Sequence, residues 1–573
     1  MATDLRKANG VHYTPDSLAR FLASVTVANM PEDRGSIRVL DPACGGGSLL
    51  AAVAQSVSPG VRRRLVLCGY ETDPAGLEEA TVRLAQLGVK ECLIRDCDFL
   101  SLPMAAGARE NRQLSLWDDD RDRTSGDLFH VVIANPPYVR TQVLGARRAQ
   151  ALACKFSLSG RVDLYHAFVK AMAGFLMPEG VLGLLTSNRF LTVRSGHAIR
   201  HFLETHFHLQ AIYDLGDTRL FSAAVLPAIV VARRKPCGPP NECGFDRVYE
   251  SRESAADNIR SSPTVLGALC DRKVAGLVRT ESGVFRIERG VLASSGPGEV
   301  WSLSTPAYDR WLRTVRESQM HQFDDVGRVR VGIKTTADEV FVRDDWDGLP
   351  QAARPEKSLL RPLLTHHDAG RWRAQSASAS SRVLYPYSLD EPKRTPVCLD
   401  SYPKARAYLE THRERLTRRR YVLEAGRKWY EIWVPQIPAD WANPKIVFPD
   451  IAEEPRFFAD SSGAIVNGDC YWITLRPGVD PQWLWLILAV ANSSFIKKYY
   501  DLAFHNKLYA GRRRFMTQYV RRFPLPALRT PIARKLASVA EQLARSAELS
   551  PEMESLADRL VWEAFGLGEE IGG

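Results

Sequence analysis

Ile37-Arg38-Val39-Leu40 leads directly into Asp41-Pro42-Ala43-Cys44-Gly45-Gly46-Gly47-Ser48, and small and apolar residues follow from Leu49 to Val57. This order predicts a short strand, a glycine-rich turn and a helix, which together form the first unit of a nucleotide-binding type of α/β fold. Three glycines allow a ligand to come close to the backbone. The turn lacks the spacing of a dinucleotide-binding fingerprint and the lysine of a phosphate loop. Asp41, at the end of the strand, instead suits a ligand that carries positive charge.

Two further predicted strands also end in acidic residues. The run Leu65–Tyr70 is followed by Glu71, whose distance from the glycine turn suits a carboxylate that accepts hydrogen bonds from a ribose. A third unit ends near Asp98 and Phe99, which are placed to hold the rim of an adenine ring. A single carboxylate of this kind is more often a solvated loop residue, but its recurrence after successive strands favours a binding site.

Asn135-Pro136-Pro137-Tyr138 follows the apolar run Leu128–Ala134, which is typical of a buried strand. The two prolines end that strand and prevent a helix from starting at once. The result is a stiff turn at the carboxyl end of a strand, where open α/β sheets bind ligands. The turn offers an amide side chain, a carbonyl group and an aromatic ring. Taken alone, a four-residue match is equally consistent with a rigid loop.

The rest of the first half completes the predicted sheet. Before the first strand, Thr14 is a suitable N-cap and Pro15 fits the first position of a helix. Apolar runs at 180–186, 211–215 and 224–232 predict further strands. Two features stand apart from the strands, a polar segment at 104–127 that predicts a surface insertion and Phe221 in the loop before the last strand.

Composition narrows the class of protein. The chain has 573 residues, which predicts two or three domains. Its apolar content of 45% is typical of a globular protein, and no apolar run reaches the length of a membrane span. The N-terminus lacks the apolar core of a signal peptide. Ten scattered cysteines without a Cys-x-x-Cys pair argue against a zinc site or a disulfide framework, so we expect no metal and a cytoplasmic location.

The positive charge is concentrated in the second half. Residues 404–535 hold 23 Lys and Arg against 12 Asp and Glu, an excess of 11 positive charges that accounts for the whole net charge of +10. Aromatic residues are interleaved with these basic residues, which suggests nucleic acid as the partner, although a solvated basic face is the simpler alternative. The candidate phosphate contacts are Arg418, Arg419, Arg420, Arg512, Arg513 and Arg514.

The order of these motifs resembles the catalytic domain of gamma-class adenine-N6 DNA methyltransferases of the TaqI type. In the second half, Val331–Val342, Lys428–Glu431, Pro444–Phe448 and Phe515–Pro526 are similar to the recognition domain of that family. The resemblance implies a Rossmann-like S-adenosylmethionine-dependent methyltransferase domain at 1–290 and an α+β target-recognition domain at 291–573. It extends over nearly the whole chain, although each motif alone is weak.

Roles for individual residues follow from the same resemblance. The residues implied to hold S-adenosylmethionine are Thr14, Asp41, Ala43, Gly45, Glu71, Asp98 and Phe99. Asn135 and Pro136 would hold the amine of a target adenine flipped out of double-stranded DNA, and Tyr138 and Phe221 would stack on the base. Two hydrogen-bond acceptors suit this amine better than a general base, because its lone pair is delocalised into the ring.

Two other classes of function stay open at this point. The same tetrapeptide could present the planar amine of an RNA base or of a protein glutamine, although the basic second half argues against this. The chain could also be a DNA-binding protein that has lost catalysis or that also cuts DNA. A restriction–modification or phage-defence system is the expected setting, with a cognate restriction enzyme as a candidate partner. By analogy with TaqI-type enzymes we expect a monomer. We expect no association with a membrane.

Overall fold

The computed structural model describes residues 14–31, 35–102, 128–138, 146–156, 158, 164–218, 220, 226–235, 242–251, 259–294, 296–375, 381–389, 391, 393–504, 508 and 511–568. The polar segment predicted as an insertion at 104–127 and the candidate stacking residue Phe221 lie outside the described residues. In the part of the chain that is described, no helix is both long and apolar enough to cross a bilayer.

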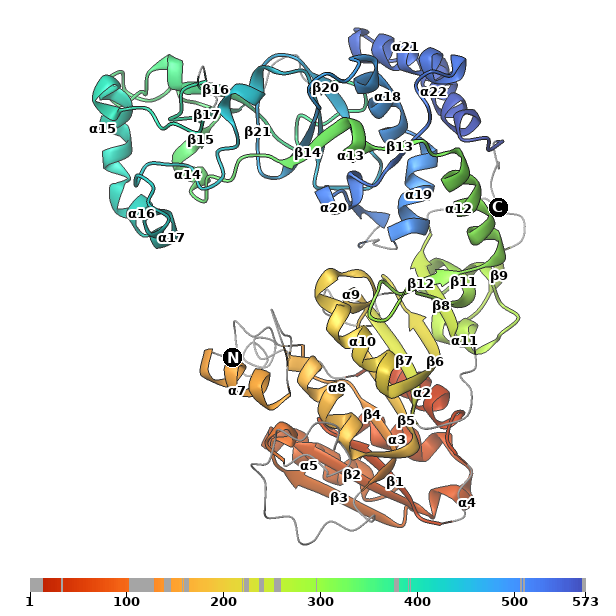
Figure 1. Cartoon of the computed structure of the whole chain (residues 1–573). Helices are drawn as coiled ribbons and strands as arrows, with labels where there is room; N and C mark the ends of the chain where they lie inside the picture. Colours follow the sequence, from red (N-terminus) through yellow and green to blue (C-terminus); the bar gives the residue numbers. More distant parts are fainter. Residues whose placement is uncertain are drawn as a thin grey trace. The chain divides into compact units, whose positions relative to one another are not determined.

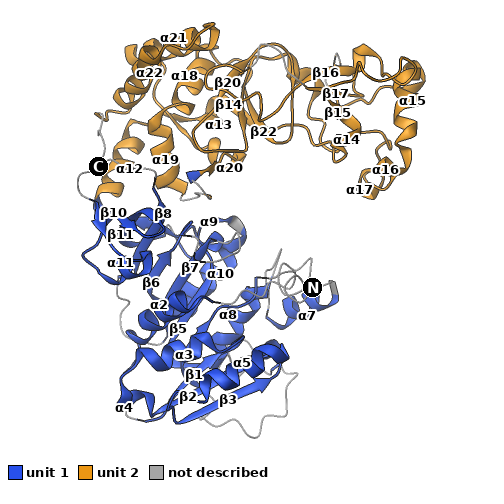
Figure 2. Ribbon diagram, turned by 180° about the vertical axis from the view of Figure 1, so that it is seen from behind, with its two compact units in different colours: residues 1–306, 509–511 blue, residues 307–508, 512–573 orange. Residues whose placement is uncertain are grey.

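The chain divides into two compact units (Figure 2). Unit 1 comprises residues 1–306 and 509–511, and unit 2 comprises residues 307–508 and 512–573. The predicted boundary near residue 290 falls inside a strand, because β11 (Gly283–Ala293) pairs with β8 (Gly244–Glu250) along most of its length. The first unit therefore continues about one short strand further than the sequence pattern suggested.

Unit 1 is built on one twelve-stranded sheet with the order β3-β2-β1-β4-β5-β7-β6-β8-β11-β10-β9, and β12 pairs with β11 (Figure 1). Neighbouring strands from β3 to β5 are parallel, whereas β7 lies antiparallel between β5 and β6. The strands are β1 Ile37–Asp41, β2 Leu65–Glu71, β3 Glu91–Asp96, β4 Phe129–Ala134, β5 Leu176–Ser187, β6 Phe207–Asp214, β7 Pro227–Arg234, β8 Gly244–Glu250, β9 Arg260–Ser261, β10 Gly276–Thr280, β11 Gly283–Ala293 and β12 Ser302–Ser304.

Helices cover both faces of this sheet. They are α2 Asp16–Val27, α3 Ser48–Ser56, α4 Pro59–Arg62, α5 Pro74–Leu84, α7 Ala146–Lys155, α8 Leu164–Phe175, α9 Arg189–Thr192, α10 His197–His206 and α11 Val265–Cys270, with short 3-10 turns η1 Phe99–Ser101 and η3 Arg194–Gly196. Helices α2, α3, α5 and α11 share one core with alternate strand residues such as Val39 and Val131. Helices α8 and α10 contact β5 and β6 but contribute nothing to that core, so they cover the other face.

Unit 2 combines two small four-stranded sheets with helices. The sheets have the orders β14-β22-β18-β20 and β15-β17-β16-β21, and two-stranded pairs β13-β24 and β19-β23 accompany them. The strands are β13 His321–Gln322, β14 Gly327–Val331, β15 Val342–Arg343, β16 Leu360–Leu364, β17 Ser381–Leu384, β18 Lys445–Pro449, β19 Ile451–Ala452, β20 Phe458–Asp460, β21 Ile465–Val466, β22 Cys470–Leu475, β23 Arg513–Arg514 and β24 Pro524–Leu525. The mixture of helices and mainly antiparallel strands confirms the predicted α+β class.

The helices of unit 2 are α12 Pro306–Ser318, α13 Phe323–Val326, α14 Asp338–Phe341, α15 Pro403–Thr411, α16 Arg413–Thr417, α17 Arg420–Glu424, α18 Gln482–Ala491, α19 Ser494–Phe504, α20 Thr517–Val520, α21 Pro531–Arg545 and α22 Pro551–Ala564; short 3-10 turns are η4 Lys357–Leu359, η5 Leu399–Ser401 and η6 Pro438–Ala442. The apolar faces of α21 and α22 are buried in the core that these helices share with α18 and α19. The closing helices therefore pack on their own unit.

Candidate functional site

The predicted site residues of unit 1 gather where the strand order of the sheet reverses. Strands β1 and β4 are parallel neighbours, with Leu40 beside Val132, and the chain leaves them in opposite directions along the sheet. Asp41 ends β1 and Asn135 follows β4, so both residues lie at the same edge of the sheet. In open α/β sheets this reversal point opens a crevice for ligands.

The glycine-rich turn after β1 has the backbone conformation that glycine alone adopts readily. Gly45 has a φ angle of 49° and Gly47 one of 76°, both in the left-handed region. The amide of Cys44 donates to the carbonyl of Tyr70 at 2.9 Å, which ties the turn to the end of β2. The predicted strand, turn and helix are confirmed. The turn is held by this backbone contact and by the carboxylates of Asp41 and Glu71, which accept from amides of the turn.

Asp41 carries a buried carboxylate that the protein satisfies only in part. Its side chain is 1% exposed, and Oδ1 accepts a hydrogen bond from the amide of Ala43 at 3.1 Å. Oδ2 is buried and has no hydrogen-bond partner among the described residues. Burial, and to a lesser extent the nearby Glu71 carboxylate, raise the pKa of Asp41 to about 7, against the lowering effect of the Ala43 amide. A cationic group with N–H donors would satisfy both the charge and the free oxygen.

Glu71 links the end of β2 to the glycine turn. One carboxylate oxygen accepts from the amide of Gly45 at 2.8 Å, and the other accepts from the amides of Thr72 and Asp73 at 2.7 and 2.8 Å. A carboxylate offers about four acceptor positions, so lone pairs are left for hydroxyl donors. The side chain is half-buried and therefore accessible to a ligand.

Asp98 and Phe99 lie together as predicted, and the ring of Phe99 packs against other aromatic rings. Asp98 caps η1 through the amide of Leu100 at 3.0 Å, and its other oxygen pairs with exposed Arg148 at 2.9 Å. The ring of Phe99 is 2% exposed and packs among the rings of Tyr70, Phe168 and Phe175. The ring therefore belongs to an aromatic core in this fold, and its contact with an adenine rim stays a prediction.

The amide of Asn135 is held between two hydroxyl groups from different parts of unit 1. Its Nδ2 donates to Thr14 Oγ1 at 3.0 Å, and its Oδ1 accepts from the hydroxyl of Tyr138 at 2.8 Å. The N-cap of α2 is Pro15 and not Thr14, and that cap makes no side-chain hydrogen bond. The predicted capping role of Thr14 is thus wrong, since its hydroxyl contacts the tetrapeptide instead.

Pro136 and Tyr138 are the other two groups of the tetrapeptide with a predicted role. Pro136 is buried, and no described residue donates a hydrogen bond to its carbonyl. Tyr138 is half-buried, and burial raises the pKa of its hydroxyl further above the normal value. Helix α8 contributes two residues that sequence reasoning did not assign: Tyr165, close enough to influence Tyr138, and Phe168, stacked on Phe99 at 6.1 Å. Their position three residues apart at the start of α8 was the available signal.

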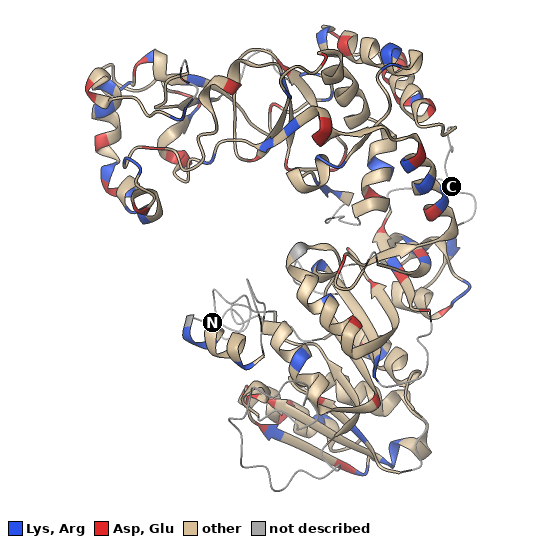
Figure 3. Ribbon diagram, in the orientation of Figure 1, with Lys and Arg blue, Asp and Glu red and all other residues tan. Residues whose placement is uncertain are grey.

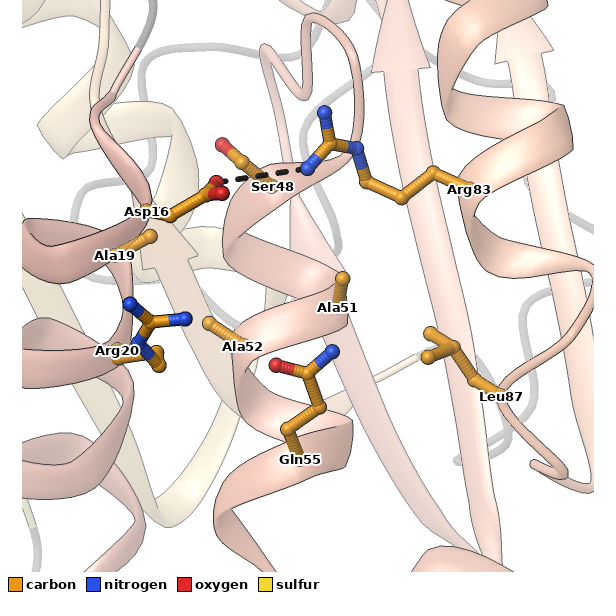
Figure 4. Close-up of a pocket in the computed structure, with 9 residues that line it drawn as sticks. All are labelled: Asp16, Ala19, Arg20, Ser48, Ala51, Ala52, Gln55, Arg83 and Leu87. Atoms are coloured by element: carbon orange, nitrogen blue, oxygen red, sulfur yellow. Dashed lines mark ion pairs between the residues drawn. The ribbon is translucent and has the colours of Figure 1, made fainter.

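A pocket of about 120 Å³ lies on the outer side of the glycine-turn helix, between α2, α3 and α5 (Figure 4). Figure 4 shows Asp16 at the start of α2 facing Arg83 of α5, and their side chains pair at 3.6 Å. Arg83 also pairs with Glu79 of its own helix at 2.7 Å. These contacts connect the helix next to Thr14 with the helix that covers the glycine turn.

Unit 2 separates the six candidate arginines into two groups. Arg418, Arg420 and Arg512 are exposed, and Arg514 pairs with Asp450 at 2.9 Å. Arg419 is 6% exposed and donates to the carbonyls of Thr335 and Trp429. Arg513 is 4% exposed and pairs with Asp501. The structure contradicts the assignment of Arg419 and Arg513 as phosphate contacts, because both guanidinium groups are buried and bonded internally.

The basic residues of this unit are interleaved with acidic ones along α15 and α16 (Figure 3). Arg413 pairs with Glu410 at 2.8 Å and Arg418 with Glu414 at 2.5 Å, both on neighbouring helical turns. No group of three or more His, Cys, Asp or Glu side chains that could hold a metal ion occurs in the part of the chain that the structure describes.

The fold and the site together define a methyltransferase joined to a DNA specificity domain. Two family models match the chain: the Eco57I restriction-modification methylase at residues 101–221 and the TaqI-like C-terminal specificity domain at residues 387–525.

Two relatives that match this chain over nearly its whole length show the family to which it belongs. The chain is 36% identical over 576 residues to the type II methyltransferase M.BanIII of Aneurinibacillus aneurinilyticus, with 98% of each protein covered. It is 26% identical to the type II methyltransferase M.PaeR7I of Pseudomonas aeruginosa, over 98% of this chain and 93% of that protein. The chain belongs to the type II DNA methyltransferases of restriction–modification systems, which confirms the resemblance found in the sequence.

One solved structure has a similar fold over both units. The type IIL restriction-modification enzyme MmeI in complex with DNA matches 97% of this chain and 73% of its own chain, with a TM-score of 0.57 and 12% sequence identity. At this identity the likeness concerns the fold alone. It agrees with an α/β unit followed by an α+β unit.

Proposed function

We propose that the chain transfers a methyl group from S-adenosylmethionine to the exocyclic N6 amine of one adenine in a specific duplex DNA sequence. The observation that carries this proposal is the placement of Asn135 and Pro136 beside Asp41 at the reversal point of the sheet. One wall of the crevice offers carboxylates and a glycine turn, and the other offers two oxygen acceptors and an aromatic ring.

The residues at the first wall fit S-adenosylmethionine. Its ammonium group would match Asp41 Oδ2, which is buried and lacks a partner among the described residues. Glu71 keeps free lone pairs for ribose hydroxyls, and Asp98 is exposed enough to accept from an adenine amine. Ala43 and Gly45 place backbone close to the ligand, and Phe99 would contact the rim of the adenine. When bound, this group supplies a methyl carbon activated by a positively charged sulfur.

Asn135 and Pro136 prepare the nucleophile. The Asn135 Oδ1 and the Pro136 carbonyl oxygen would each accept one N–H of the target amine. This pair of bonds favours a pyramidal nitrogen with a free lone pair, which is the geometry of the transition state and not of the planar ground state. The new bond joins N6 to the methyl carbon, the carbon–sulfur bond breaks with its electron pair on sulfur, and the extra proton on nitrogen leaves to water.

The target base must leave the duplex to reach this turn, because a stacked base cannot approach a pocket at a sheet edge. Tyr138 would stack on the extruded ring, and stacking of this kind contributes about 1–3 kcal/mol. Phe221 is the proposed second aromatic residue. The exposed arginines of unit 2, Arg418, Arg420 and Arg512, would contact phosphates and orient the duplex.

Single-molecule sequencing of DNA from a host with and without the gene tests the proposal. We expect N6-methyladenine at one recognition sequence only in the strain with the gene, and none in a strain with Asn135→Ala. Methylated cytosine at a defined sequence would retain the enzyme class and overturn the adenine assignment. An unmodified genome, together with methylation of RNA or of a protein glutamine by the purified chain, would overturn DNA as the substrate.

A further inference from the structure

The side chain of Asn135 has two ends of nearly equal size, an oxygen and an NH2 group. Only one orientation presents the oxygen to a target amine, because the other would bring two sets of N–H donors together. The proposed chemistry therefore depends on contacts that hold this amide in place. Rotation about the last side-chain bond has broad minima, and within the tetrapeptide the Tyr138 hydroxyl contacts the oxygen end at 2.8 Å.

Thr14 lies at the NH2 end of this side chain. Its Oγ1 accepts from Asn135 Nδ2 at 3.0 Å, across 121 residues of sequence. Thr14 is 9% exposed and immediately precedes α2, whose Leu18 and Leu22 are completely buried in the core of unit 1. A rigid, packed element thus holds this hydroxyl, as a positioning contact requires.

The hydroxyl of Thr14 can make this contact because it does not cap α2. Pro15 occupies the N-cap of α2, and the cap position makes no side-chain hydrogen bond. Loss of the Thr14 hydroxyl would therefore remove the bond to Asn135 without removing a helix cap.

We infer that Thr14 is a positioning residue for methyl transfer: it holds the amide of Asn135 through Nδ2, at the end opposite to the oxygen that would meet the target amine. This role rests on the proposed function, because it assumes that Asn135 Oδ1 accepts from the substrate. It differs from the contact with S-adenosylmethionine expected of Thr14 from the family resemblance, since a positioning role changes the chemical step rather than cofactor affinity.

The test compares Thr14→Val with Thr14→Ser, and uses Thr26→Val as the matched control. Valine has the shape of threonine without the hydroxyl, whereas serine keeps the hydroxyl. Thr26 lies on α2, the helix that follows Thr14, is fully buried and donates to the Leu22 carbonyl at 2.7 Å, far from the tetrapeptide in sequence. Its variant therefore measures the general cost of removing a buried hydroxyl from α2.

The first readout is the single-turnover methylation rate at saturating DNA and S-adenosylmethionine, together with cofactor affinity by calorimetry. We expect Thr14→Val to lower this rate on the order of 10- to 100-fold, as misplaced catalytic groups do. Thr14→Ser should stay within about threefold of wild type, and Thr26→Val should match wild type. A slow Thr14→Ser variant, or a Thr14→Val variant that loses cofactor affinity but keeps its rate at saturation, would overturn the inference.

The second readout does not depend on catalysis. Duplexes carry adenine or unsubstituted purine at the target position, each opposite an abasic site, so that they differ only in the 6-amino group and not in base pairing. Wild type should bind the adenine duplex more tightly, and Thr14→Val should reduce this preference at least several-fold while Thr26→Val keeps it. An unchanged preference in Thr14→Val contradicts the inference. Absence of both the preference and adenine methylation in wild type would instead reject the proposed function.

Discussion

At the scale of single residues, the site of this methyltransferase contains groups that are only partly satisfied by the protein. Asp41 Oδ2 has no partner among the described residues, and the Pro136 carbonyl receives no hydrogen bond from them. Asn135 Oδ1, in contrast, accepts from Tyr138 at 2.8 Å. The Tyr138 hydroxyl therefore contacts the same oxygen that we propose for the target amine, and this oxygen has two lone pairs.

The first residue-scale prediction separates the ring of Tyr138 from its hydroxyl. Tyr138→Phe keeps the stacking surface and removes the hydroxyl that contacts Asn135 Oδ1. Extrusion of a target 2-aminopurine, measured by its fluorescence, should therefore equal or exceed that of wild type. Tyr138→Ala should weaken binding of the extruded base by about 1–3 kcal/mol. If Tyr138→Phe weakened binding of the extruded base as much as Tyr138→Ala, the hydroxyl rather than the ring would be the group that binds the base.

The second residue-scale prediction concerns Asp41, whose pKa is raised from 3.8 to about 7 mainly by burial. A carboxyl with a raised folded-state pKa contributes stability below its unfolded pKa and loses that contribution as pH rises through about 7. The ligand-free protein should therefore lose stability between pH 4 and 8, by up to a few kcal/mol (roughly 1.4 per pKa unit).

Asp41→Asn should flatten this part of the pH profile in thermal unfolding, and should be more stable than wild type at pH 8. The same variant should bind S-adenosylmethionine much less tightly, because the negative charge is gone. Parallel pH profiles for the two proteins would show that Asp41 is ionised in the ligand-free fold. Ser56→Ala, a loss of a part-buried hydroxyl bond on α3, is a suitable control outside the site.

At the scale of elements, buried ion pairs distinguish structural arginines from surface ones. Strand β23 contains Arg513, which donates to both carboxylate oxygens of Asp501 at 2.8 and 2.7 Å and to the Glu453 carbonyl. It connects α19 with the β19-β23 pair. Arg512, the residue before it, is exposed. Arg513 is part of the two-residue strand and is bonded to α19, whereas Arg512 lies just before the strand and is exposed, so the two neighbours have different roles.

The element-scale prediction compares these neighbours. Arg513→Ala should lower the free energy of unfolding by about 3–5 kcal/mol, because it leaves the Asp501 carboxylate without its buried partner. Arg512→Ala should change that free energy by less than about 0.5 kcal/mol. Urea unfolding of both variants measures the difference. Equal stabilities would show that the Arg513 pair contributes nothing beyond an exposed salt bridge.

At the scale of the whole molecule, chemistry and recognition are assigned to separate compact units. The proposed cofactor and base contacts lie in unit 1, and the excess of positive charge lies within residues 404–535, nearly all of which belong to unit 2. Substitutions in the exposed basic residues of unit 2 should therefore change DNA affinity without changing cofactor affinity.

The whole-molecule prediction uses Arg418 and Arg420, which are exposed on either side of the buried Arg419. The double variant Arg418→Ala/Arg420→Ala should weaken DNA binding about equally for all sequences. It should reduce the slope of log affinity against log salt by about 2, or roughly 0.9 per phosphate contact. Calorimetry should give an unchanged affinity for S-adenosylmethionine. An unchanged salt slope would show that these two arginines do not contact DNA phosphates.

The sequence by itself determined the parts of this protein that depend on local physics. Alternating and continuous apolar runs predict β1, β2 and β4, glycines predict the turn after Asp41, and prolines predict the stiff turn at Asn135. Because parallel strands place their carboxyl ends at one edge, this order also predicted the crevice. The family resemblance then supplied a role for each motif.

Only the tertiary structure decided how distant side chains use their polar groups. The hydroxyl of Thr14 meets Asn135 across 121 residues of sequence, the ring of Phe99 joins an aromatic core, and Arg419 and Arg513 are buried. Local propensity favoured a helix cap at Thr14 and phosphate contacts at the two arginines. Packing prevailed because a buried donor without an acceptor, or an exposed apolar ring, costs more free energy than a local preference contributes.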